Sequence, residues 1–181
     1  MNFGKEEQNE FIIKFCGLGG MGIILTSIIL GKAAVYDNKN AIQTQSYGPE
    51  QRGTTVTSDV IISDEELISF PVEQKLDFLV AFSQDAYNSY KQIVKENGLI
   101  FVNSDLAKIN SGETNTFKIP ASSIAMELNN EKVLNVAMLG GLVKITNLVS
   151  KESIIKSINN TVHSRFVSLN VSAFNRGYSY F

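Results

Sequence analysis

The stretch FIIKFCGLGGMG, at residues 11–22, decides how the first third of this chain folds. Its apolar beginning is short and rich in isoleucine and phenylalanine, which is typical of a strand covered on both faces. Gly17, Gly19 and Gly22 follow with the spacing GxGxxG, which lets backbone N–H groups approach a phosphate beside the positive amino end of a helix. The stretch therefore predicts a strand, an anion-binding turn and a helix over residues 21–36 that is apolar around most of its circumference and must be buried.

A second informative segment, QTQSYGPEQRG at residues 43–53, reads as a strand that ends in a polar loop with one arginine, Arg52. Loops at the carboxyl ends of successive strands of a parallel sheet lie side by side, so we expect this loop and the glycine turn to face one crevice. A nicotinamide site would also need an acidic residue about 20 residues beyond the glycines. Residues 43–46 supply no carboxylate there, which argues against a dinucleotide. Two interpretations remain open: a phosphate-binding turn, or glycines that serve only a tight strand-to-helix connection.

The remainder of the chain alternates between strand-like and helix-like segments, without an internal repeat. Adjacent glycines at Gly140 and Gly141 cost a helix about 1 kcal/mol each relative to alanine, so we expect another backbone to approach closely there. We therefore predict the α/β class: a single Rossmann-like domain over residues 1–181, with a mostly parallel sheet and helices on both faces. Further strands are predicted at residues 54–63, 76–82, 99–103 and 117–120, and further helices at residues 84–95 with Ser83 as the cap, from Ser122 or Ser123, at residues 133–149, and in two segments after Ser150.

The composition is that of an ordinary globular subunit: 181 residues, 44% of them hydrophobic, with a formal net charge of −2. This charge gives no reason to expect nucleic acid or a membrane surface as a partner. The first ten residues, MNFGKEEQNE, do not resemble a secretory signal, and no apolar run reaches the roughly 18 residues of a membrane span. We therefore expect a cytoplasmic protein without a membrane span.

The chain contains one cysteine, Cys16, and one histidine, His163. A single cysteine excludes an internal disulfide and cannot supply four thiolates to an iron–sulfur cluster. We expect Cys16 to be buried, with a reactive thiol beside the glycine turn as the alternative. A zinc site is not expected without a second histidine, and no self-sufficient catalytic set is recognisable.

Six segments occur in a characteristic order: GLGGMG (17–22), QTQSYGPEQRG (43–53), SDVIISDEELISFP (58–71), LDFLVAFSQDAY (76–87), GLIFVNSDL (98–106) and LNVAMLGGLV (134–143). In this order the chain resembles the gamma subunit of 2-oxoacid:ferredoxin oxidoreductases, and most of all the 2-oxoglutarate:acceptor type. It departs from the usual family pattern at Met21, where glutamine is usual, and at Thr54, where glycine is usual. A thioether cannot donate a hydrogen bond, so we expect none from the Met21 side chain to a ligand.

The resemblance implies the fold of the pyruvate:ferredoxin oxidoreductase gamma subunit and a place in a multisubunit enzyme. That enzyme would convert 2-oxoglutarate, coenzyme A and an oxidised acceptor to succinyl-CoA, carbon dioxide and the reduced acceptor. Thiamine diphosphate and iron–sulfur clusters would belong to partner subunits, namely alpha, beta and a ferredoxin-like delta, with ferredoxin or another carrier as electron acceptor. This chain would border coenzyme A, because backbone N–H groups, a helix amino end and Arg52 all favour an anion. The expected cofactor-binding residues are Gly17, Gly19, Gly20, Met21, Gly22, Ser46, Tyr47, Gly48 and Arg52, with no catalytic residue and no metal ligand.

Two other functions remain open: a purely architectural subunit of a pyruvate or branched-chain 2-oxoacid oxidoreductase, and a free-standing nucleotide-binding oxidoreductase. The sequence does not decide which 2-oxoacid or electron acceptor is used, nor the subunit stoichiometry. The isolated chain is expected to be inactive, and it is expected to form a homodimer through apolar surface that partners would cover. The aromatic residues Tyr178, Tyr180 and Phe181 are candidates for such an interface.

Overall fold

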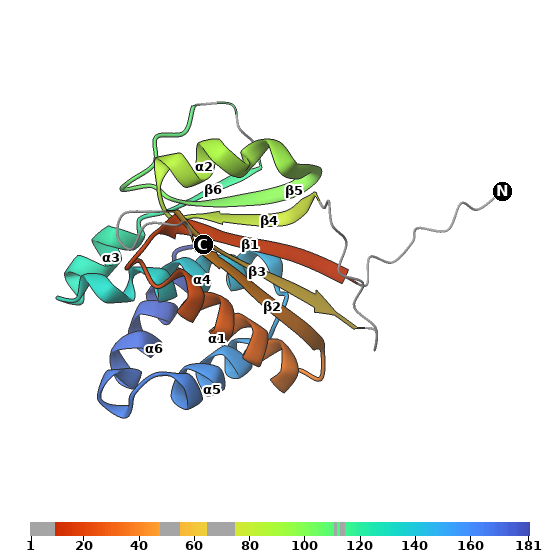
Figure 1. The fold of residues 1–181 in the computed structure, drawn as a ribbon. Helices are drawn as coiled ribbons and strands as arrows, with labels where there is room; N and C mark the ends of the chain where they lie inside the picture. Colours follow the sequence, from red (N-terminus) through yellow and green to blue (C-terminus); the bar gives the residue numbers. More distant parts are fainter. Residues whose placement is uncertain (1–9, 48–54, 65–74, 111, 113–114) are drawn as a thin grey trace.

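A six-stranded sheet with the order β2-β3-β1-β4-β5-β6 forms the centre of the molecule (Figure 1). The computed structural model describes residues 10–47, 55–64, 75–110, 112 and 115–181. Strands β1, β4, β5 and β6 run parallel to one another, whereas β3 is antiparallel to both β1 and β2. The strands are β1 Glu10–Leu18, β2 Asn40–Tyr47, β3 Thr55–Ser63, β4 Leu76–Ala81, β5 Val94–Asn103 and β6 Thr116–Ile119.

Helices cover both faces of the sheet, but unequally (Figure 1). The larger core lies on the face that packs against α1, α3 and α4, with α5 and α6 outside them, and the smaller core lies under α2. The predicted α/β fold, with a mostly parallel sheet and helices on both faces, is therefore confirmed. The helices are α1 Ile23–Tyr36, α2 Gln84–Tyr90, α3 Ala121–Glu127, α4 Leu134–Thr146, α5 Lys151–Thr161 and α6 Ser164–Tyr178, with short 3-10 turns at Lys91–Ile93 and Glu131–Val133. Among the described residues, no helix is long and apolar enough to cross a membrane.

The first two strands along the chain are separated in the sheet. β1 and β2 are not neighbours, because β3 returns between them in the antiparallel direction.

The predicted helix at residues 84–95 is shorter than expected. It ends at Tyr90, and Val94 already pairs with Leu76 as the first residue of β5. This early start requires glycine at position 98, because a Cβ there would lie 2.9 Å from the Asp77 carbonyl oxygen. The pairing of β4 with β5 is irregular at this point, between Leu76 and Phe78.

Helix α4 passes without a break through both of its glycines, and the expected close backbone approach is confirmed. A Cβ on Gly140 would lie 2.6 Å from the Tyr178 nitrogen of α6. In return, a Cβ on Gly177 of α6 would lie 2.8 Å from the Ala137 carbonyl carbon of α4. The two helices therefore pack backbone against backbone, which explains why α4 is buried from Asn135 to Val143. The aromatic residues at the carboxyl terminus are only partly covered, because Phe181 packs edge-on to Phe117 with ring centroids 5.7 Å apart and remains 42% exposed.

Asp37 joins the end of α1 to the start of α5. Its carboxylate accepts hydrogen bonds from the Ser150 backbone N–H, from the Ser150 hydroxyl at 2.7 Å and from the Ser153 hydroxyl. Burial raises the pKa of this carboxyl, but the hydrogen bonds from the two serines outweigh it and the pKa is lowered. Asp37 therefore stabilises the fold at neutral pH, and this contribution is lost as the pH falls through its folded-state pKa.

Replacing Asp37 with Asn should accordingly lower the free energy of unfolding at pH 7 by about 1–2 kcal/mol, the usual worth of a charged helix-capping contact. The difference between the variant and the wild type should shrink as the pH falls below 3.8 and through the lowered folded-state pKa, where the wild-type carboxyl becomes protonated too. Urea unfolding at pH 7 and at about pH 2.5 measures both values. An equal difference at the two pH values would contradict the role assigned to the charge.

Candidate functional site

The glycine turn between β1 and α1 is shaped by steric requirements that only glycine meets. Gly20 and Gly22 have φ angles of 95° and 75°, in the left-handed region that other residues rarely adopt. Glycine is required at position 17 for a different reason: a Cβ there would lie 2.8 Å from both the Phe82 Cβ and the Ile23 Cδ1. The Met21 N–H closes the turn by donating to the Leu18 carbonyl oxygen at 3.2 Å. The predicted strand, glycine turn and helix are thus present, with α1 starting at Ile23.

The amino end of α1 lacks a capping side chain. Gly22 is its N-cap residue and has no side chain that could cap the first turn, and the first turn contains no acidic residue. Gly19 and Gly20 are exposed, so the backbone of the turn is accessible. The first N–H groups of a helix lack partners within it and carry the positive end of its dipole. This geometry can hold a phosphate or another anion without any charged side chain.

The Met21 side chain faces inward. It is half-buried and packs against the larger core, with its Sδ only 3.3 Å from the position that a Cβ on Gly17 would occupy. Met21 therefore contributes its backbone and its packing to the turn rather than a polar contact.

The strand of the second predicted segment, β2, ends at the same edge of the sheet as β1, but these two strands do not pair with each other. In the register of β3, Leu18 pairs with Thr55 and Tyr47 pairs with Val56. The ends of β1 and β2 are therefore two strand spacings apart, about 10 Å. Ser46 is exposed at this edge, whereas Gly48 and Arg52 lie outside the described residues.

A cluster of polar side chains links α1 to β2 and β3. The Gln43 amide nitrogen donates to the Ser58 hydroxyl at 2.8 Å and to the Ser27 hydroxyl at 3.2 Å. Ser58 in turn donates to the Thr44 carbonyl oxygen at 2.6 Å. From the sequence, Gln43 was considered only as one of the residues that lack the carboxylate of a nicotinamide site. Its role is to hold the edge strand against the helix that follows the glycine turn.

Asn135 is the residue of this site that the sequence analysis missed. It lies at the start of α4, and its Nδ2 donates to the Gly22 carbonyl oxygen at 3.1 Å. A Cβ on Gly22 would lie 2.8 Å from the Asn135 Cγ, so the glycine and the asparagine fit each other. The signal in the sequence was a single amide at the head of LNVAMLGGLV, an otherwise apolar helix.

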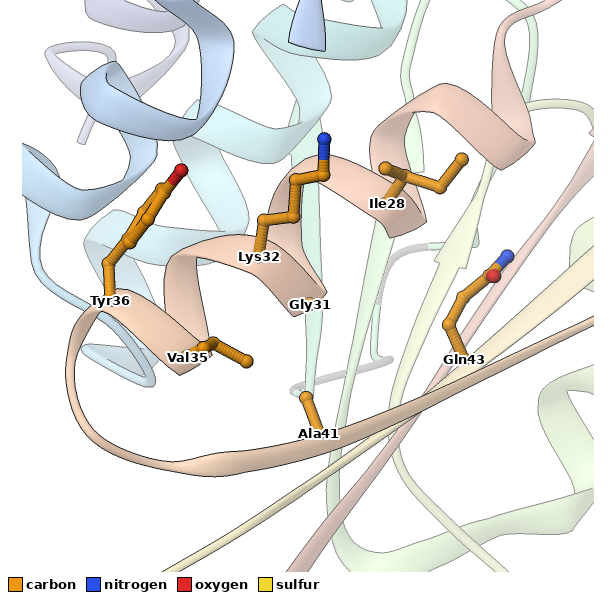
Figure 2. A pocket seen from close by; sticks show the side chains of 7 residues that line it. All are labelled: Ile28, Gly31, Lys32, Val35, Tyr36, Ala41 and Gln43. Carbon is orange, nitrogen blue, oxygen red and sulfur yellow. The ribbon is translucent and has the colours of Figure 1, made fainter. Parts of the chain in front are cut away.

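A separate groove of about 420 Å³ lies between α1 and β2. Figure 2 shows its walls, with Val35 on α1 and Ala41 on β2. Its lining is mostly apolar, and none of the residues predicted for the glycine-turn site belongs to it. The lining residues are Ile28, Gly31, Lys32, Val35, Tyr36, Ala41 and Gln43.

Cys16 is fully buried, as expected. Burial raises its pKa from the ordinary value of 9.0 to about 12, with the Lys14 charge lowering it and the Asp59 charge raising it by smaller amounts. Because the thiolate is the reactive form, Cys16 should react with a thiol reagent such as dithionitrobenzoate far more slowly in the folded chain than in urea, by a factor of at least about 100. Stopped assays at pH 8 compare the two rates. Similar rates in buffer and in urea would show that the thiol is accessible.

His163 caps α6, where its Nδ1 accepts a hydrogen bond from the Arg165 N–H at 3.4 Å. Its side chain is exposed at a helix end. Across the described ranges, no group of three or more histidine, cysteine, aspartate or glutamate side chains is arranged to hold a metal ion.

The chain matches the family model described as pyruvate ferredoxin/flavodoxin oxidoreductase over residues 12–180. It belongs to this family. Within the family it is a gamma-type subunit of the 2-oxoacid:ferredoxin oxidoreductases, similar to those of 2-oxoglutarate synthases. The 2-oxoglutarate synthase subunit KorC of Methanocaldococcus jannaschii is 47% identical over 92% of this chain and 91% of that protein. KorC of Methanothermobacter marburgensis is 40% identical over 91% and 93%, respectively.

Two solved structures show the same fold as this gamma-type subunit. The gamma subunit of a keto/oxoacid ferredoxin oxidoreductase from Geobacter sulfurreducens superimposes with a TM-score of 0.82 at 39% identity, over 94% of this chain and 95% of that one. A 2-oxoglutarate:ferredoxin oxidoreductase from Magnetococcus marinus superimposes with a TM-score of 0.83 at 22% identity, over 96% of this chain and 31% of that one. The second likeness concerns the fold alone.

Proposed function

We propose that this chain is the gamma subunit of a 2-oxoglutarate:ferredoxin oxidoreductase and that its glycine turn borders the coenzyme A site. The observation that carries the proposal is the uncapped amino end of α1 behind the exposed residues Gly19 and Gly20. Coenzyme A carries a pyrophosphate and a further phosphate, and a helix amino end with free N–H groups suits such an anion. The similarity to the KorC subunits supports 2-oxoglutarate as the substrate of the complex.

The chemistry of decarboxylation and electron transfer belongs, in this proposal, to partner subunits of the alpha, beta and delta types. Thiamine diphosphate would react with the 2-oxoacid there, and iron–sulfur clusters would pass electrons to ferredoxin or another acceptor. The present chain is unsuited to hold a cluster, because its one cysteine is buried with a raised pKa. Its own part is to bind and orient the phosphates of coenzyme A, so the isolated chain should not turn over substrate.

A tagged chain, purified anaerobically from its native cells, tests this function. We expect the other subunits to copurify and the eluate to oxidise 2-oxoglutarate only when coenzyme A is present. Parallel assays with pyruvate and with branched-chain 2-oxoacids provide the comparison. Faster turnover of one of these would overturn the substrate, and purification of the chain without partner subunits would overturn the complex.

A further inference from the structure

Asn135 has a buried side-chain amide of which only the nitrogen end is hydrogen-bonded. It is only 1% exposed, and its Nδ2 donates to the Gly22 carbonyl oxygen. Its Oδ1 is also buried, yet it accepts no hydrogen bond from the described residues. The orientation of the amide is determined by Gly22, because a carbonyl oxygen can only accept and the nitrogen must face it.

A buried acceptor without a partner costs free energy, so stability alone does not explain an asparagine here. The residues that follow it in α4 are apolar or glycine as far as Val143, and a leucine at this position would avoid the cost. What the asparagine supplies, and leucine would not, is the hydrogen bond to Gly22.

That hydrogen bond acts on the peptide group that begins α1. The Gly22 carbonyl oxygen also accepts from the Thr26 N–H and the Thr26 hydroxyl, each at 3.0 Å. The carbonyl belongs to the same planar unit as the Ile23 N–H, which points the opposite way. Fixing the carbonyl from inside the molecule therefore directs the first N–H of α1 outward, at the open end of the helix.

We propose that Asn135 is a positioning residue for coenzyme A: by holding the Gly22 carbonyl it orients the N–H groups of the glycine turn toward the phosphates. This inference rests on the proposed function of the turn. It adds a residue from the other half of the chain, 113 positions from Gly22, which does not itself touch the ligand.

The test uses Asn135→Leu and Asn135→Ala, which both remove the amide donor, in the anaerobically purified complex, with Asn175→Leu as the matched control. Asn175 also has a buried Oδ1 without a partner, but it lies on α6 away from the turn. For both Asn135 variants we expect the KM for coenzyme A to rise about fivefold with kcat within twofold, as loss of one positioning hydrogen bond implies. Hydrogen exchange of the peptide covering residues 17–26 should become faster. The control should change neither quantity.

Each outcome has a distinct meaning. Unchanged exchange at residues 17–26 in both Asn135 variants would overturn the positioning role. Faster exchange with an unchanged KM would also overturn it, if a second variant, Gly19→Asp, which places a carboxylate on the exposed turn, does raise the KM for coenzyme A in the same complex. If Gly19→Asp has no effect on the KM either, the proposed function of the turn is what fails, and the inference fails with it.

Discussion

Replacing Gly177 with alanine should lower the free energy of unfolding by about 3 kcal/mol or more. The added Cβ would lie 2.8 Å from the Ala137 carbonyl carbon and closer still to its oxygen, and both atoms belong to the backbone of α4. No side chain can move aside, so α4 and α6 would have to separate. The gain in helix propensity, about 1 kcal/mol, is too small to compensate. Urea unfolding of the isolated chain, followed by circular dichroism, measures the change.

Gly31→Ala is the matched control for this prediction. Gly31 also lies within a helix, α1, but a Cβ there meets nothing within 4 Å. The same substitution should therefore stabilise the chain by about 0.5–1 kcal/mol through helix propensity and a less flexible unfolded state. If Gly177→Ala remained within 1 kcal/mol of the wild type, the close packing of α4 on α6 would be wrong.

The second large effect concerns the glycine turn. Gly19→Asp would place a carboxylate on the exposed turn beside the amino end of α1, where the proposed phosphates bind. Gly19 is not among the glycines with positive φ, so an aspartate there avoids the left-handed conformation that Gly20 and Gly22 adopt. Repulsion of the ligand by about 1.4 kcal/mol would raise the KM for coenzyme A tenfold. Steady-state kinetics of the complex over a range of coenzyme A concentrations measures it, and added salt should weaken the effect.

Gly19→Asn separates charge from shape, because asparagine has the size of aspartate without its charge. We expect its KM for coenzyme A to stay within about twofold of the wild type, since the neutral amide does not repel phosphate. A purely architectural turn would give a different pattern: the two variants would assemble equally poorly with partner subunits, and the KM of the assembled complex would not change.

The sequence was sufficient for elements whose signal is local. The apolar run before Gly17, the left-handed glycines and the apolar circumference of α1 all predict their own conformation, and the structure agrees. Ser83 likewise caps α2 as expected, by accepting from the Ala86 N–H. Which strands pair with each other, in contrast, does not follow from the local sequence pattern. Nothing in the pattern of residues 54–63 indicates that β3 should enter between β1 and β2, so the sequence did not predict that these two strands are separated in the sheet. The loop that follows β2 lies outside the described residues, and its place beside the glycine turn stays a prediction.

Only the local part of the candidate site could be predicted from the sequence. The glycine turn depends on consecutive residues, and the sequence alone located it. Asn135 reaches Gly22 only because α4 packs beside the start of α1. The spacing of residues along the chain does not predict this tertiary contact. The hydrogen bonds of Gln43 with Ser27 and Ser58 also form only once three elements have met.

The central claim, that the glycine turn borders coenzyme A, is tested most directly by covalent mapping. The anaerobically purified complex would be irradiated with a photoreactive coenzyme A analogue, digested, and analysed by mass spectrometry. The account predicts a label on residues 17–26 of this chain that unmodified coenzyme A competes away. Competable labels confined to partner subunits would contradict it.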